Sequence, residues 1–199
     1  MCGMTREEDI AYAAYLGVDA IGLIFAEKSS RLITLSHAEK LMSNLPPFLN
    51  VIAVLVNPSQ DFVEEMLHKL PISFLQFHGN ESEEFCNYFN KPYIKAVQID
   101  SFNAVDNYVK CYQKASGLLL DTPSENHGGT GKTFNWEFIP KHVKKPLVLA
   151  GGLNAANVEA ALKMCSPYAV DVCSGVESSP GVKDHKKMKE FVEAIWGKA

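Results

Sequence analysis

Seven short apolar segments recur along the chain, and segments with the hydrophobic spacing of helices lie between them. Nonpolar residues are nearly continuous in the apolar segments, which is typical of strands that are covered on both faces. These segments are residues 19–25, 50–56, 72–78, 93–99, 117–121, 146–152 and 168–174. Strands and helices in regular alternation predict a parallel sheet with right-handed crossover connections.

The spacing of these units favours a closed barrel. The predicted strands end at steps of 20 to 32 residues, which is about the size of one βα unit. An eighth unit would be complete if a strand ended at Cys2, 23 residues before residue 25. We therefore expect residues 1–199 to form one domain, a compact (β/α)8 TIM barrel whose first strand is largely missing from this chain. A doubly wound open sheet is the alternative, but no G-x-G-x-x-G motif follows the first strand.

Composition and charge narrow the classes of partner. The 199 residues carry a formal net charge of -4, which argues mildly against nucleic acid or an anionic membrane, although a small anion needs only a local site. No apolar run reaches the roughly 20 residues of a membrane span, and we find no signal-peptide pattern. The five cysteines are scattered, without a C-x-x-C pair. We expect a cytoplasmic protein with reduced thiols and no metal site.

Polar residues gather where the predicted strands end, which is where (β/α)8 barrels carry their chemistry. Asp121 closes an apolar strand, so burial would raise its pKa and make it a usable acid near neutrality; a turn or capping role is the alternative. As a thiolate, Cys2 could act as a base or nucleophile if it ends a strand, but it would be inert at a frayed terminus. The other candidates are Arg31, whose fork could grip a carboxylate, Gln76, His78 and Asp171.

Two glycine-rich turns, LAGGLNAANV and CSGVESSPG, follow the last two predicted strands. Glycines at such turns let backbone amides converge on an anion, so we expect a phosphate site rather than tight turns alone. Its residues would be Gly151, Gly152, Asn154, Ser174 and Gly175. A third glycine-rich segment, 127–136, is not a P-loop, because Asn126 stands where that motif needs glycine. We expect this segment, with Gly129, to cover the substrate.

The motifs CGMT, LQFHGNES, GGTGKTF, LAGGLNAANV and VDVCSGVE resemble those of phosphoribosylanthranilate isomerase of tryptophan biosynthesis, in the family's order from residue 2 to about 192. The resemblance implies a phosphate-binding barrel that performs an Amadori rearrangement on a phosphorylated small molecule, with no metal or organic cofactor. It also implies residue roles: Cys2 as general base, Asp121 as general acid, Arg31 facing the anthranilate moiety, Gln76 and His78 lining the site, and Gly152, Asn154, Ser174 and Gly175 at the phosphate.

Two features depart from the family's pattern. Cys173 stands where serine is common, and only Met1 precedes the CGMT cysteine, where the family has a longer first strand. We therefore expect either a native start upstream or a barrel with an open seam between unpaired neighbouring strands and a mobile Cys2. The alternatives in function are a phosphate-binding barrel without catalysis and a sister enzyme such as indole-glycerol-phosphate synthase. The sequence is compatible with a monomer or a homodimer.

Overall fold

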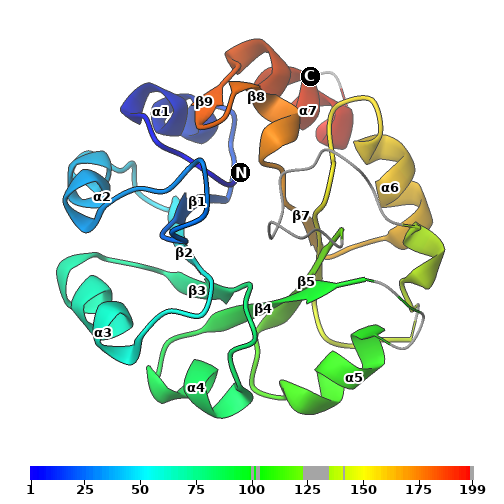
Figure 1. Ribbon diagram of the computed structural model, residues 1–199. Coiled ribbons are helices and arrows are strands. Elements are labelled where there is room, and N and C mark those ends of the chain that lie inside the picture. Colours follow the sequence, from blue (N-terminus) through cyan, green and yellow to red (C-terminus); the bar gives the residue numbers. More distant parts are fainter. Residues whose placement is uncertain (100, 102–103, 123–134, 141, 198–199) are drawn as a thin grey trace.

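Seven parallel strands form one sheet in the computed structural model, which describes residues 1–99, 101, 104–122, 135–140 and 142–197. The strands lie in the sheet in the same order as in the chain, and the sheet curls around a common centre with the helices outside (Figure 1). They are β1 (Ala20–Ile24), β2 (Asn50–Leu55), β3 (Phe74–Phe77), β4 (Tyr93–Gln98), β5 (Gly117–Asp121), β6 (Leu147–Leu149) and β7 (Ala169–Val170). Each lies within one predicted segment, so the prediction of a curled parallel α/β sheet is confirmed.

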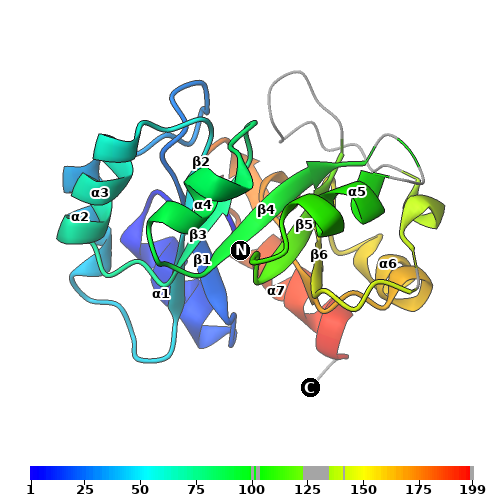
Figure 2. The same ribbon diagram turned by 90° about the horizontal axis from the view of Figure 1, so that it is seen from below.

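The helices pack on the outer face of the sheet. Figure 2 shows α2 and α3 at one side of the sheet and α6 at the other. The helices are α1 (Glu7–Tyr15), α2 (Leu35–Met42), α3 (Gln60–Lys69), α4 (Glu83–Tyr88), α5 (Ala104–Cys111), α6 (Val158–Cys165) and α7 (His185–Trp196). Thr34, Ser59, Ser82 and Asp184 each accept a backbone hydrogen bond in the first turn of the helix that follows, so local capping sets where four of these helices begin.

Four short elements were not predicted from the sequence. A 3-10 helix, η1 (Trp136–Phe138), precedes β6, and a second, η2 (Ser174–Val176), follows β7. The chain then forms an antiparallel pair, β8 (Glu177–Ser179) and β9 (Val182–Lys183), before α7 begins. This pair returns Lys183 to the end of β7, where the functional residues lie.

The first four residues lie between β1 and the segment that follows β7. The Gly22 amide donates to the Met1 carbonyl at 2.9 Å, and the Met4 amide donates to the Gly22 carbonyl at 3.0 Å. On the other side, the Cys2 amide donates to the Val172 carbonyl at 2.9 Å. The expectation of unpaired neighbouring strands is therefore wrong, because this short segment satisfies main-chain groups on both. Cys2 is held by the backbone and is only 8% exposed.

Alternate residues of the strands point to the centre of the sheet. The central layer holds small apolar side chains, including Ala96, Leu119 and Ala150, which form a separate buried cluster. The larger side chains on the opposite face, such as Phe77 and Leu118, pack into the main core beneath the helices. This period of two places Asp121 on the same face as Leu119, directed toward the centre.

A buried ion pair fixes the loop after β3, which carries the predicted histidine of the site. The Lys95 ammonium donates to the Phe77 carbonyl at 3.1 Å, the Gly79 carbonyl at 2.6 Å and the Glu81 carboxylate at 3.1 Å. The second oxygen of Glu81 accepts from the Asn57 amide at 2.7 Å and the Gly79 amide at 3.1 Å. Because both charges are fully buried, the loop depends on this pairing for its shape.

We expect Lys95→Met to lower the free energy of unfolding by about 3–5 kcal/mol, because it leaves the Glu81 carboxylate buried without its cation. Urea unfolding followed by circular dichroism measures this loss. Lys69→Met is the matched control, since it removes a similar pair with Glu65 whose side chains are 45% and 52% exposed, and it should leave stability almost unchanged. Equal losses in the two variants would contradict the structural role of the buried pair.

Candidate active site

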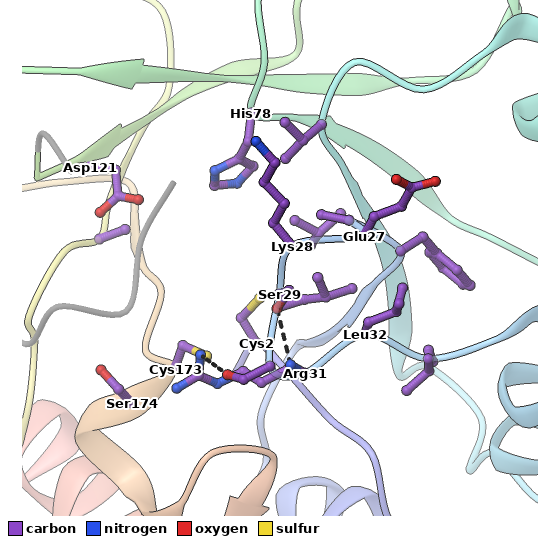
Figure 3. Close-up of a pocket in the computed structure, with 18 of the residues that line it drawn as sticks. Cys2, Glu27, Lys28, Ser29, Arg31, Leu32, His78, Asp121, Cys173 and Ser174 are labelled. Carbon is purple, nitrogen blue, oxygen red and sulfur yellow. Dashed lines mark hydrogen bonds between the residues drawn. The ribbon is translucent and has the colours of Figure 1, made fainter. Parts of the chain in front are cut away.

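A cavity of about 1150 Å³ opens at the carboxyl ends of the strands. Its lining comes from the loops after β1, β2, β3, β5, β6 and β7 and from the N-terminal segment, so residues distant in the sequence meet there (Figure 3). Among the described residues, it brings together nine of the predicted site residues: Cys2, Arg31, His78, Asp121, Gly151, Gly152, Asp171, Ser174 and Gly175.

Two predicted site residues in the described part of the chain, Gln76 and Asn154, do not line the cavity. Gln76 is buried beneath it, and its side-chain oxygen lies 2.7 Å from Nε2 of His78, so it orients the histidine ring from behind. Asn154 uses its side chain inside its own turn, accepting from the Ala156 amide at 2.9 Å. Gly129 lies outside the described residues.

Burial dominates the electrostatics of Asp121. Removal from water raises the pKa of its carboxyl group from 3.8 to about 6, although the Thr122 amide, which donates to Oδ1 at 2.8 Å, partly offsets the effect. The nearby Asp171 raises this pKa further, and burial raises the pKa of Asp171 itself. The predicted desolvation of Asp121 thus agrees with its surroundings, and this carboxyl can carry a proton near neutral pH.

Cys2 lies against Gly22 on β1, where there is no room for a side chain. A Cβ atom at Gly22 would be 2.7 Å from Sγ and 3.0 Å from Cα of Cys2. The hydrogen-bonding interaction with Cys173 raises the pKa of the Cys2 thiol, and burial and Asp171 act in the same direction. The same interaction lowers the pKa of Cys173. The two thiols are therefore coupled, and a negative charge on one of them is stabilised by the hydrogen bond from the other.

Arg31 is held by a protein carboxylate. Its Nε and Nη2 donate to the two oxygens of Glu177 at 2.8 and 2.6 Å, and its side chain is only 12% exposed. Lys183 donates to the same carboxylate at 3.0 Å. The sequence predicted that this fork could grip a carboxylate with two hydrogen bonds, and in the structure Nε and Nη2 bind the carboxylate of Glu177. Arg31 still lines the cavity, so it supplies positive charge at the wall.

The two glycine-rich turns pack directly against each other. Gly151 and Gly152 have φ angles of 77° and 68°, which favour glycine, and a Cβ at Gly151 would lie 2.9 Å from Oδ1 of Asp121. A Cβ at Gly175 would collide with the Leu153 carbonyl oxygen. The absence of side chains therefore lets both turns border the cavity with backbone, beside the hydroxyl-bearing Ser174.

Sequence reasoning missed several functional neighbours. Lys28 lines the cavity and points toward His78, and Figure 3 shows both side chains directed into the same space. Glu177 and Lys183 were not singled out, and Cys173 was noted only as an unusual residue. A charged residue four positions after the cysteine in CSGVE was visible in the sequence, but its partner Arg31 is 146 residues away.

Among the described residues, no group of three or more histidine, cysteine, aspartate or glutamate residues is arranged to hold a metal ion. No helix in the described part of the chain is long and apolar enough to cross a membrane.

Comparison with known proteins identifies the family. The family model described as N-(5'-phosphoribosyl)anthranilate isomerase matches residues 1–194. The chain belongs to this family. The N-(5'-phosphoribosyl)anthranilate isomerase of Legionella pneumophila is 56% identical over 198 residues, which cover 99% of this chain and 96% of that protein.

Solved structures agree with this assignment. The crystal structure of phosphoribosylanthranilate isomerase from Thermotoga maritima matches with a TM-score of 0.92 and 36% identity, covering 100% of this chain and 98% of that one. A second structure of such an isomerase, in complex with reduced 1-(o-carboxyphenylamino)-1-deoxyribulose 5-phosphate, matches with a TM-score of 0.88 and 33% identity, covering 99% and 97% of the two chains.

As a member of this family, the chain is an isomerase of tryptophan biosynthesis. It converts N-(5'-phosphoribosyl)anthranilate to 1-(2-carboxyphenylamino)-1-deoxyribulose 5-phosphate. The activity predicted from the sequence motifs is therefore confirmed.

We expect Asp121→Asn to stabilise the fold at alkaline pH relative to the wild type. Because the folded pKa of about 6 lies above the unfolded value near 3.8, the folded protein binds this proton more tightly, and wild-type stability is lost as pH rises through 6. Asparagine does not ionise and keeps an oxygen for the Thr122 amide. The variant's advantage should grow by on the order of 2 kcal/mol between pH 4.5 and pH 8.

Urea titrations at several pH values measure this difference, and Asp19→Asn, which removes an exposed carboxylate away from the cavity, is the control. If the difference in stability between Asp121→Asn and the wild type does not change with pH, ionisation of the Asp121 carboxyl does not destabilise the fold, and the prediction is wrong.

Proposed function

We propose that this isomerase works by general acid–base catalysis, with Asp121 as the acid and Cys2 as the base. The observation that carries the proposal is that the two side chains come from distant parts of the chain, β5 and the N-terminal segment, yet line one cavity (Figure 3). Burial raises the pKa of the Asp121 carboxyl to about 6. Cys2 is a thiol beside Cys173, whose own pKa is lowered.

Asp121 opens the sugar ring. Protonated, it donates its proton to the ring oxygen of the ribose as the bond between that oxygen and C1 breaks, and the anthranilate nitrogen forms a Schiff base with C1. The buried position supports this step, because desolvation keeps the carboxyl protonated nearer to neutral pH than an exposed aspartate would be.

Cys2 then removes the proton from C2 of the opened sugar, which yields an enolamine that tautomerises to the ketone. The base must be a thiolate, although the pKa of Cys2 is raised. If Cys173 is a thiolate and Cys2 is a thiol, transfer of the Cys2 proton to Cys173 leaves the negative charge on Cys2. The pair can then provide the base without losing a second proton. Cys173 acts here as a positioning residue, through Cys2.

The phosphate of the substrate binds at the glycine-rich turns in this proposal. Backbone of Gly151, Gly152 and Gly175 borders the cavity with the hydroxyl of Ser174, and the turn of Asn154 is closed by its own side-chain hydrogen bonds. Binding of the phosphate here would hold the sugar in place between acid and base. Lys28 and Arg31 supply positive charge in the part of the wall formed by the loop after β1, where the anthranilate carboxylate would lie.

Residues 1–4 complete the barrel. They take the place of the first strand by accepting and donating main-chain hydrogen bonds to Gly22 and Val172, and so close the ring of seven strands into the (β/α)8 arrangement. We propose that residues 1–199 form one catalytic domain, a cytoplasmic monomer or homodimer, that needs no metal or organic cofactor for this reaction.

We expect Cys2→Ala and Asp121→Asn each to lower kcat by about 10²–10⁴ while the product still binds, because each removes one proton transfer. The loss of phosphoribosylanthranilate fluorescence measures turnover, and calorimetry with the product measures binding. Cys111→Ser and Asp19→Asn, which change an exposed thiol and an exposed carboxylate outside the cavity, are the controls. Near-normal kcat in both active-site variants would refute the assignment of acid and base.

A further inference from the structure

Two thiols stand side by side in the wall of the active-site cavity. Cys2 and Cys173 both line it, and they pack together in a small apolar cluster with Ile24 and Val54. Cys173 is partly exposed, whereas Cys2 is 8% exposed. A small oxidant that enters the cavity can therefore reach the pair. The catalytic proposal uses these thiols only for proton transfer, which leaves their chemistry toward oxidants unassigned.

Backbone geometry places the two cysteines within reach of a covalent bond. The Cys2 amide donates at 2.9 Å to the carbonyl of Val172, the residue before Cys173, so the two backbone segments are hydrogen-bonded neighbours here. The two thiols also interact through a side-chain hydrogen bond. The sulfur of Cys173 also lies against this backbone, since a Cβ at Gly3 would be 2.9 Å from it.

The surroundings favour a reactive thiolate at this position. The interaction with Cys2 lowers the pKa of Cys173, as do Lys183 and Arg31, while burial and Glu177 oppose the shift. The Lys183 ammonium lies 3.9 Å from the Cys173 sulfur and donates to its carbonyl at 3.1 Å. Nucleophilic cysteines occupy accessible, electropositive surroundings of this kind, whereas buried structural cysteines do not.

We propose that Cys2 and Cys173 form a reversible oxidation site, in which a peroxide converts the two thiols into an intramolecular disulfide across the active site. The site would be reopened by small-molecule or protein dithiols. Its effect on activity rests on the role of Cys2 as the base.

The chemistry proceeds in two steps. The Cys173 thiolate attacks one oxygen of hydrogen peroxide, the O–O bond breaks, and the other oxygen leaves as hydroxide, which takes up a proton to become water; Cys173 is then a sulfenic acid. The Cys2 sulfur attacks the Cys173 sulfur, the S–O bond breaks, and the second oxygen leaves as water with the Cys2 proton. The two sulfurs lose two electrons in total, and these reduce one peroxide to two waters.

We expect brief treatment of the purified wild-type protein with hydrogen peroxide to lower its mass by two hydrogen atoms and to join the peptides of Cys2 and Cys173. Isomerase activity should fall on the order of tenfold or more, because a disulfide sulfur cannot accept a proton, and dithiothreitol should restore both mass and rate. Cys111→Ser is the control, since it removes an exposed thiol of α5 outside the cavity, and it should behave as the wild type.

Cys173→Ser separates this inference from direct oxidation of the base. This variant should form no cross-linked peptide. Brief peroxide treatment should leave its isomerase activity close to that of the same variant before treatment, because the thiol with the lowered pKa is absent. The inference is overturned if the wild type gains oxygen instead of losing two hydrogens, or if Cys173→Ser forms the same oxidised species. If the disulfide forms between Cys2 and Cys173 without loss of activity, the site stands and the role of Cys2 as base fails. Differential alkylation of the wild type gives the same answer should the variant not fold.

Discussion

Main-chain hydrogen bonding between neighbouring parallel strands is the constraint on which the active site depends. The register pairs Gln98 with Asp121 and Leu120 with Leu149, and it brings the strand ends to one side of the sheet. A slip of one residue in β5 would turn Asp121 from the cavity toward the helices. At the N-terminal segment a few such bonds suffice, because the amides of Cys2, Met4 and Gly22 connect it to both neighbours. The same network thus sets the positions of the acid and the base.

The site keeps two partly buried carboxyl groups at a cost in stability. Asp121 and Asp171 both line the cavity, and each has a pKa raised mainly by burial. The amino group of Met1 lies 4.0 Å from Asp171, but among the described residues Asp121 has no ion pair comparable to that of Glu81 with Lys95. An ion pair would lower the pKa of Asp121 and remove its use as an acid, so function and stability make opposite demands at this position.

Local patterns in the sequence predicted what depends on local physics. Continuous apolar runs identified all seven strands, and the end of β5 after three leucines predicted the desolvation of Asp121. Contacts between distant residues could not be predicted in this way. The pairing of Arg31 with Glu177, the hairpin of β8 and β9, and the bonds that hold the first four residues all join segments far apart in the chain. A segment too short to be a strand can still form main-chain hydrogen bonds with the segments on both sides of it. The number of residues available for a strand does not reveal this.

Glu177 sets the balance of charge beside the thiol pair. Its carboxylate accepts two bonds from Arg31, one from Lys183 and one from the Gly181 amide, so the cluster beneath the pair has two cations and one anion. The remaining positive charge stabilises one thiolate. A second thiolate would have no further cation in this cluster to balance it, and Asp171 already raises the pKa of Cys2. When the two sulfurs share one proton and one negative charge, Cys2 can accept a proton from the substrate. The same arrangement, a thiolate beside a thiol, is what disulfide formation requires.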